Sequence, residues 1–297
     1  MIHQGALRYA GFRYLWITVA LIALSAALFV TQGGMIFARG DTWQGYTLGS
    51  IAALLIVWLA LLGIRKRRYQ SGMGSVQGWT SAHIYLGMAV VVIATLHCAA
   101  QFHGNIHTYA YLLMCGVVVS GIVGLLFYAN VPRQQSANRS GIPRSELFGE
   151  LFELDAQARD LANACEPDIA SAVKSSIERT VVGGGALVQL MGIDHSLFEN
   201  PAVITGDRTS SLSSNVDQRA VIACVANRVP RAYKESEAAG LRSLVVVLSR
   251  RQTILRRIRR DIQLQGWLRA WLYVHVPLTM ATIAALIVHI LSSFMYL

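Results

Sequence analysis

Four histidines lie in long apolar stretches of the sequence, where ionisable side chains are rare. They form two pairs with the same spacing, because His83 and His97 are 14 residues apart and so are His275 and His289. This spacing is close to four turns of an α-helix, so both members of a pair lie on one helix face, about 21 Å apart along the axis. An unpartnered polar group in hydrocarbon costs several kcal/mol, and we therefore expect these histidines to have a function.

The arrangement of two histidines at each of two levels favours iron ligation in haem. On parallel helices, His83 faces His275 and His97 faces His289, and each pair can supply the two axial ligands of one haem b. No CxxCH motif for covalent haem attachment is present. A zinc site across the levels is excluded, because its three or four ligands must converge on one point. The alternative is four core histidines that are hydrogen-bonded between helices.

Glycines in neighbouring apolar stretches match the depths of the histidines. Gly49 and Gly63 are also 14 residues apart, with Gly49 expected at the outer level and Gly63 at the inner level. Gly116 and Gly124 belong to a small-residue face in the predicted fourth span, 108–129. A flat macrocycle inside a bundle needs helices with a smooth surface, so these glycines are candidate haem contacts; ordinary helix packing is the alternative.

Polar residues near the ends of the apolar stretches are the remaining candidates. Arg39 outside and Arg65, in the inner run 65–68, are placed to pair with haem propionates, although membrane topology also explains the inner run. His103 and His107 lie in an outer turn, where they could contact a propionate, a quinone or an external partner. Exposed loop histidines usually have no such role.

The elements that must position these residues are transmembrane helices. The chain has 297 residues, of which 54% are hydrophobic and only 14% charged. Four stretches contain no charged residue, and the 64-residue stretch 69–132 is long enough for two spans. We predict an all-α membrane protein with five transmembrane helices, the last four forming a haem-binding bundle. The predicted spans are 14–37, 45–64, 81–101, 108–129 and 270–295.

Basic residues predict the orientation of these helices. Of the 26 lysines and arginines, only Arg39 falls on the side opposite to the others. Because basic residues mark the cytoplasmic side, the N-terminus is expected in the cytoplasm and the C-terminus in the periplasm of a bacterial-type inner membrane. The net charge of +10 therefore reflects topology and contact with membrane lipid, and no nucleic-acid partner is expected. One span separates the third from the fifth, so these two helices run parallel.

Residues 133–266 form a second compositional unit, between residues 1–132 with four spans and residues 267–297 with the fifth. This segment carries 15 of the 16 acidic residues and is predicted to be a soluble, mainly helical cytoplasmic insertion. A helix is expected at 145–165 and a long helix from Glu235 towards the last span. Ala202–Thr205 and Val221–Val225 fit either strands or short helices. We expect the insertion to fold and to serve as a docking surface; a flexible tether is the alternative.

The histidine pairs and the neighbouring glycine pair resemble the di-haem b-type cytochromes. This superfamily includes the cytochrome b of quinol:cytochrome c oxidoreductases and the membrane domain of ferric reductases and NADPH oxidases. The resemblance covers spans two to five and implies two b haems and electron transfer across the membrane. Ferric reductases also carry flavin and nicotinamide domains, but the segment Val-Val-Gly-Gly-Gly-Ala at 181–186 fails the GxGxxG spacing of dinucleotide sites.

The expected function is that of a membrane di-haem cytochrome b, an electron-transfer component that exchanges electrons with the quinone pool or a redox partner protein. Two alternatives belong to other classes. One is a haem-bearing anchor subunit that assembles a larger complex. The other is a transporter, which is disfavoured because the spans contain no carboxylate and no paired glycine or proline interruptions in related halves.

Overall fold

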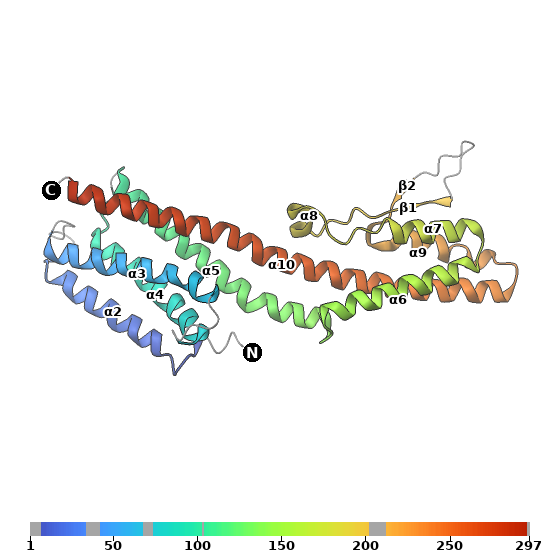
Figure 1. Ribbon diagram of the computed structural model, residues 1–297, viewed down its shortest axis with the longest axis horizontal. Helices are drawn as coiled ribbons and strands as arrows, with labels where there is room; N and C mark the ends of the chain where they lie inside the picture. Colours follow the sequence, from blue (N-terminus) through green and yellow to red (C-terminus); the bar gives the residue numbers. More distant parts are fainter. Residues whose placement is uncertain (1–6, 34–41, 68–73, 103, 202–211, 296–297) are drawn as a thin grey trace. The chain divides into compact units, whose positions relative to one another are not determined.

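The computed structural model describes residues 7–33, 42–67, 74–102, 104–201 and 212–295, and these are predominantly helical (Figure 1). Within these ranges, five helices are long and apolar enough to cross a membrane. They are α2 (Arg13–Val30), α3 (Trp43–Arg67), α4 (Val76–His97), α5 (Ile106–Arg139) and α10 (Glu235–Met295). The prediction of an α-helical protein with long apolar helices is confirmed.

The chain divides into two compact units. The first comprises residues 1–129 and 270–297, and the second comprises residues 130–269. The boundaries predicted from the sequence lie at 132/133 and 266/267. Helices α5 and α10 each contribute residues to both units, so the insertion begins and ends within continuous helices.

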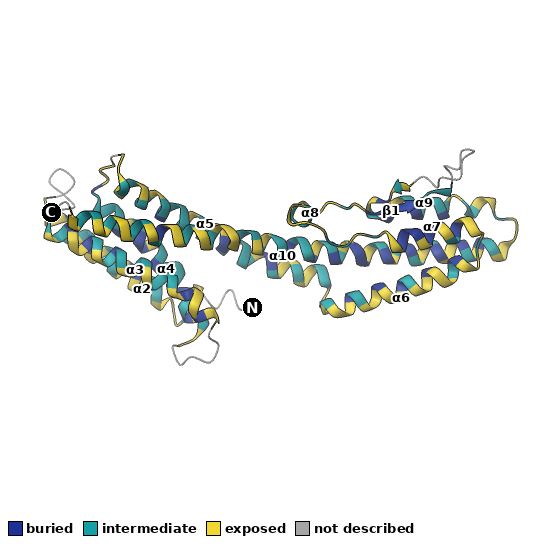
Figure 2. Ribbon diagram, turned by 45° about the horizontal axis from the view of Figure 1, so that its top comes forward, coloured by how far each residue is buried: buried dark blue, intermediate teal, exposed yellow. Residues whose placement is uncertain are grey.

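In the first unit, α4 packs along both α2 and α3. Their shared core contains Phe29 from α2, Leu48 and Ala52 from α3, and Ala89 and Ile93 from α4. Small alanines let helix backbones approach closely, which is typical of packing between membrane helices. Figure 2 shows exposed residues on the outer faces of these helices, as expected for surfaces in contact with lipid.

Several helix ends differ from the predicted spans, and α2 ends at Val30 instead of residue 37. Helix α4 ends at His97 instead of residue 101, because Ala99 and Ala100 adopt positive φ angles of 49° and 56° that close the helix. Helix α5 continues past the predicted end at 129, through Pro132, to Arg139. A transmembrane span ends where the apolar residues end, whereas a helix ends where its backbone hydrogen bonds end. The two ends therefore need not coincide.

In its described residues, the second unit contains four further α-helices and a small antiparallel sheet. Helix α6 (Arg144–Asn163) fits the prediction for 145–165, and it is followed by α7 (Pro167–Glu178) and the short α8 (Ala186–Met191). Strands β1 (Leu197–Glu199) and β2 (Leu212–Ser214) pair with Phe198 opposite Ser213. Residues 219–226 form α9, so Val221–Val225 is helical. Ala202–Thr205 lies outside the described residues. Two short 3-10 turns lie at Val216–Gln218 and Val229–Arg231.

The second unit has an apolar core of its own. Phe198 of β1, Val221 and Val225 of α9 and Leu244 of α10 are fully buried there, together with residues of α6 and α7. A second cluster joins α6 to α10 through Leu147, Leu151, Leu255 and other apolar residues. Buried clusters of this kind stabilise a folded module, and they argue against a flexible tether within the described part of the insertion.

One ion pair in this unit provides a pH-dependent prediction. The Arg256 guanidinium donates a hydrogen bond to the Asp217 carboxylate at 2.7 Å and, with Arg219 and Arg259 nearby, holds the pKa of that carboxyl below its usual value. A lowered folded-state pKa stabilises the fold above the unfolded pKa of about 3.9, and this stabilisation is lost as the pH falls through the folded-state value. Asp217→Asn should therefore reduce stability at pH 7 by about 1 kcal/mol and have little effect near pH 3.

Thermal unfolding in detergent at the two pH values tests this. Asparagine tolerates the left-handed conformation of Asp217 (φ 55°), so the substitution changes charge with little backbone strain. An equal loss of stability at both pH values would show that the carboxylate charge is not what stabilises this turn.

Candidate functional site

His97, the last residue of α4, is oriented by helix α3. Its Nδ1 atom lies 2.8 Å from the carbonyl oxygen of Gly45, and a neutral imidazole bonded in this way presents Nε2 to a partner. The His97 ring centroid lies 6.1 Å from that of His289 on α10, with the two ring planes at 80°. The structure therefore brings together the outer histidine pair that the spacing predicted.

His107, at the start of α5, contacts the second member of this pair. The Nδ1 atoms of His107 and His289 are 2.5 Å apart, so one ring donates a hydrogen bond to the other. Their ring centroids lie 4.5 Å apart. His107 was one candidate contact for a propionate, a quinone or an external partner, and in the structure its ring bonds to that of His289. Such a bond to Nδ1 is the usual way in which a metal-ligating imidazole is held in place.

The inner pair is held by the same kind of contact. His83 on α4 places Nδ1 3.1 Å from the carbonyl oxygen of Leu59 on α3, while His275 on α10 places Nδ1 2.7 Å from Oγ of Ser120 on α5. His83 and His275 lie within electrostatic range of each other. Each of the four histidines thus has one ring nitrogen engaged by the protein, in each case Nδ1, and is half-buried.

A tryptophan that the sequence analysis did not single out covers one inner histidine. The Trp271 ring stacks on His275 with centroids 5.0 Å apart, and its Nε1 donates to the Ser120 carbonyl oxygen at 2.7 Å. The indole lies so close to the buried Gly124 that a Cβ atom there would overlap it. Gly124 therefore accommodates Trp271 in this structure. Four-residue spacing on α10 is the signal that could have found Trp271 beside His275.

The inner basic run has two different environments. Arg65 is buried, and its guanidinium donates to the Gly74 carbonyl oxygen at 2.6 Å, which secures the turn before α4. Lys66 lies within electrostatic range of both His83 and His275, with its Nζ 5.2 Å from the centre of the Tyr128 ring. Lys66 is therefore a described basic residue of this run whose charge acts on both inner histidines. The sequence alone did not separate these neighbours.

The predicted glycines differ in what they contact. A Cβ atom on Gly49 would lie 2.8 Å from the His97 ring, so this glycine lets α3 approach the outer histidine. A Cβ atom on Gly116 would lie 3.4 Å from the Leu278 side chain of α10, which is ordinary helix packing. A Cβ on Gly63 would have no atom within 4 Å, so the structure does not place Gly63 against either inner histidine. Arg39 and His103 lie outside the described residues.

The outer histidine pair has the ring separation that bis-histidine haem requires. Two imidazoles that bind one metal from opposite sides need ring centroids about 6 Å apart, since each metal–nitrogen bond is about 2 Å. The 6.1 Å between His97 and His289 meets that requirement. Within the described ranges, no group of three or more histidine, cysteine or acidic side chains is placed to hold a metal ion. A haem iron needs only two, and the neutral nitrogen donors here suit iron.

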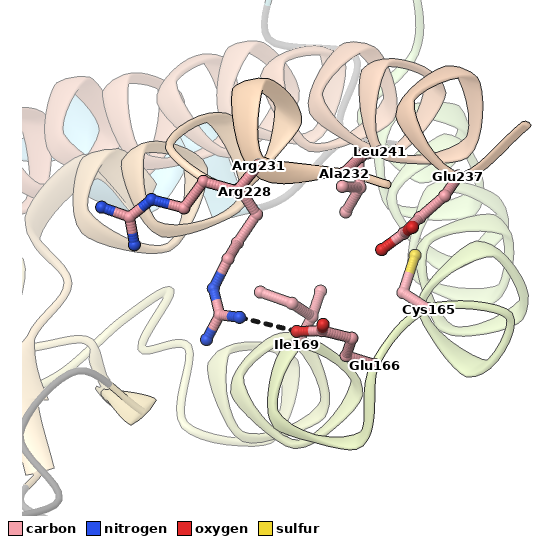
Figure 3. A pocket seen from close by; sticks show the side chains of 8 residues that line it. All are labelled: Cys165, Glu166, Ile169, Arg228, Arg231, Ala232, Glu237 and Leu241. Carbon is pink, nitrogen blue, oxygen red and sulfur yellow. Dashed lines mark hydrogen bonds and ion pairs between the residues drawn. The ribbon is translucent and has the colours of Figure 1, made fainter. Parts of the chain in front are cut away.

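A pocket in the second unit is a weaker candidate. Eight residues line about 370 Å³ of space that is open to solvent (Figure 3). Two of its four charged residues form an ion pair, because Arg228 donates to Glu166 at 2.6 Å. Burial and nearby carboxylates raise the pKa of the Cys165 thiol, which keeps it protonated and poorly nucleophilic. The four cysteines are half-buried free thiols.

Two glycine substitutions test whether the position of the His97 ring is needed for haem binding. Gly49→Leu should displace the His97 ring, because even a Cβ atom at this position comes within 2.8 Å of it. We expect this variant to lose most of the haem at the outer level. Gly63→Leu is the matched control, because its side chain enters open space.

The haem content of both purified variants is measured by the pyridine haemochrome assay. Full haem content in Gly49→Leu would mean that the outer histidine is not needed for binding. If Gly63→Leu also lost haem, the loss would indicate contact between that helix face and the macrocycle.

Comparison of the chain with protein-family models, with curated proteins and with solved structures finds no match.

Proposed function

We propose that the chain is an integral membrane di-haem b-type cytochrome that carries single electrons across a bacterial-type inner membrane. The observation that carries the proposal is the outer pair, in which His97 and His289 approach to 6.1 Å while their Nδ1 atoms bond to Gly45 and His107. This leaves Nε2 of each ring for a metal. The bonds to Gly45 and His107 also fit core histidines that are hydrogen-bonded between helices, so it is the 6.1 Å approach of the two rings that favours an iron between them.

The protein's own residues would determine where and how such groups bind. His97 and His289 would hold the outer iron, and His83 and His275 would hold the inner iron, about 21 Å away along the helices. When bound, a b haem supplies reversible one-electron chemistry. The Gly45 and Leu59 carbonyls, His107 and Ser120 orient the imidazoles and make them more basic, which lowers a reduction potential.

Positive charge near the inner histidines would favour binding of the haem propionates on that side. Lys66 lies near both inner histidines, and Arg65 and Arg67 are its neighbours in α3. Cationic groups bind carboxylates by charge-assisted contacts. In this proposal Lys66 takes the role expected for Arg65, whose guanidinium is bonded to Gly74. The orientation with the inner end in the cytoplasm rests on the basic residues in 65–68.

The electron donor and acceptor are proposed by class. A quinol or a redox partner protein suits the chain, because 181–186 lacks the spacing of a dinucleotide site. The folded second unit offers a surface for a partner protein or a larger complex. A quinol analogue added to the purified protein tests the first possibility: we expect b-type absorbance on reduction, and its absence would favour a haem-bearing anchor.

The proposal as a whole is tested by haem quantification and a reduced-minus-oxidised optical spectrum of the purified protein. We expect two non-covalent b haems per chain. A chain without haem, or with haem that acidic acetone fails to extract, would overturn it.

A further inference from the structure

The longest stretch without a charged residue in the insertion, from Thr180 to Ile193, has no part in the proposed electron-transfer site. It contains the three glycines at 183–185 and helix α8, whose sequence is Ala-Leu-Val-Gln-Leu-Met. None of the α8 residues is buried. Leu187 is 69% exposed and Met191 is 67% exposed. An apolar helix that leaves its largest side chains in water needs a covering surface.

The place of α8 along helix α10 indicates which surface that is. Gln263 of α10 donates to the Leu190 carbonyl oxygen at 3.0 Å, and Leu190 also lies against Gly266. Gly192, with φ 67°, ends α8 and allows the Gln263 side chain to approach closely. Helix α8 is thereby fixed beside residues 263–266 of α10 (Figure 1).

Residues 263–266 lie just before the part of α10 that is apolar enough to enter the membrane. The charge-free stretch of α10 begins at Ala270, which is four residues, or about 6 Å, beyond Gly266 along the helix axis. Trp267 is 43% exposed and Tyr273 is 80% exposed, and such aromatic residues collect at membrane interfaces. Arg260 and Arg269 are exposed on either side of the contact with α8. Arginines at this depth attract anionic lipid headgroups.

We propose that α8 is a membrane-interface helix, which inserts Leu187 and Met191 into the lipid leaflet where α10 enters the membrane, on a surface of anionic phospholipid. The contact anchors the second unit to the bilayer at a point separate from its two connecting helices. It explains why a glycine-rich, uncharged segment occurs in an otherwise charge-rich insertion. It requires a membrane-embedded chain and is independent of haem.

Fluorescence quenching by lipid tests the proposal on the full chain. Met191→Cys is labelled with a small environment-sensitive fluorophore, after the four native cysteines are replaced by alanine. The protein is placed in nanodiscs that contain phosphatidylglycerol and a lipid with a nitroxide near the headgroup. Tyr233→Cys is the matched control, since Tyr233 is 96% exposed and lies just before α10 begins at Glu235, about 45 Å from Gly266 along the axis.

We expect roughly threefold stronger lipid quenching at position 191 than at position 233. Equal quenching at both positions overturns the proposal. Protection of position 191 from aqueous iodide without lipid quenching also overturns it, because a protein partner or a second copy would then cover α8.

Crosslinking of the unaltered chain gives a second measurement that needs no substitution. A photoactivatable phospholipid should form adducts within 186–193 and none within 212–233. Absence of adducts from 186–193 contradicts the inference, whatever the haem content of the preparation.

Discussion

His97→Ala and His289→Ala are expected to remove the same haem and to leave the other in place. The two rings face each other across α4 and α10, so neither can hold an iron from both sides alone. His83→Ala and His275→Ala should remove the second haem. Optical redox titration of the four purified variants should therefore give two matching pairs of spectra, each with about half of the parental haem.

His107→Ala is the informative control for this series. Its ring contacts His289 through Nδ1 and is not expected to ligate iron. We expect the variant to keep both haems, with a changed midpoint potential for the outer one, since loss of an orienting bond alters ligand basicity. If His83→Ala matched His289→Ala instead of His275→Ala, the parallel arrangement of α4 and α10 would be contradicted.

The histidine levels could be predicted from sequence because they depend on helix periodicity alone. Fourteen residues return to the same face of any α-helix, and hydropathy places the helices. The groups that orient the rings could not be predicted. Ser120 and His275 are separated by 155 positions, and the Gly45 and Leu59 acceptors are backbone carbonyls, which every residue has.

Residues of similar chemistry that share a pattern in the sequence can be told apart only by their contacts in the structure. Arg65 and Lys66 look alike as members of a basic run, yet one is buried against Gly74 and the other lies near the inner histidines. Gly49 and Gly63 share the spacing of the histidines, but only Gly49 meets a histidine ring. Pro277 lies inside α10, two residues after His275 and far from the start of that helix.

The same limit applies to the insertion. The run Val221–Val225 is too short for its periodicity to distinguish a strand from a helix. In α9, Val221 and Val225 lie one turn apart and both enter the core, which is a tertiary outcome. Helix α6 was predictable because its apolar residues repeat over five turns, long enough to define a buried face.

Arg251→Met is expected to unfold much of the second unit, with a loss of about 3–5 kcal/mol. The Arg251 side chain is only 1% exposed, and its guanidinium donates to Asp155, Gln218 and Thr180. Methionine replaces much of its volume but none of its donors, so a largely buried carboxylate loses its counter-charge. The second unit's protease resistance and its midpoint in urea should both fall, while the haem spectrum persists if α10 still enters the membrane.

Two further variants identify the cause of that loss. Arg256→Met removes another arginine of the same helix, but its side chain is 51% exposed, so the expected cost is only about 0–1 kcal/mol. Adding Asp155→Leu to Arg251→Met removes the stranded carboxylate and should recover part of the stability, because replacing both members of a buried pair costs less than breaking it. If the double variant were no more stable than Arg251→Met, the loss would come from the bonds to Gln218 and Thr180 and not from the unpaired charge.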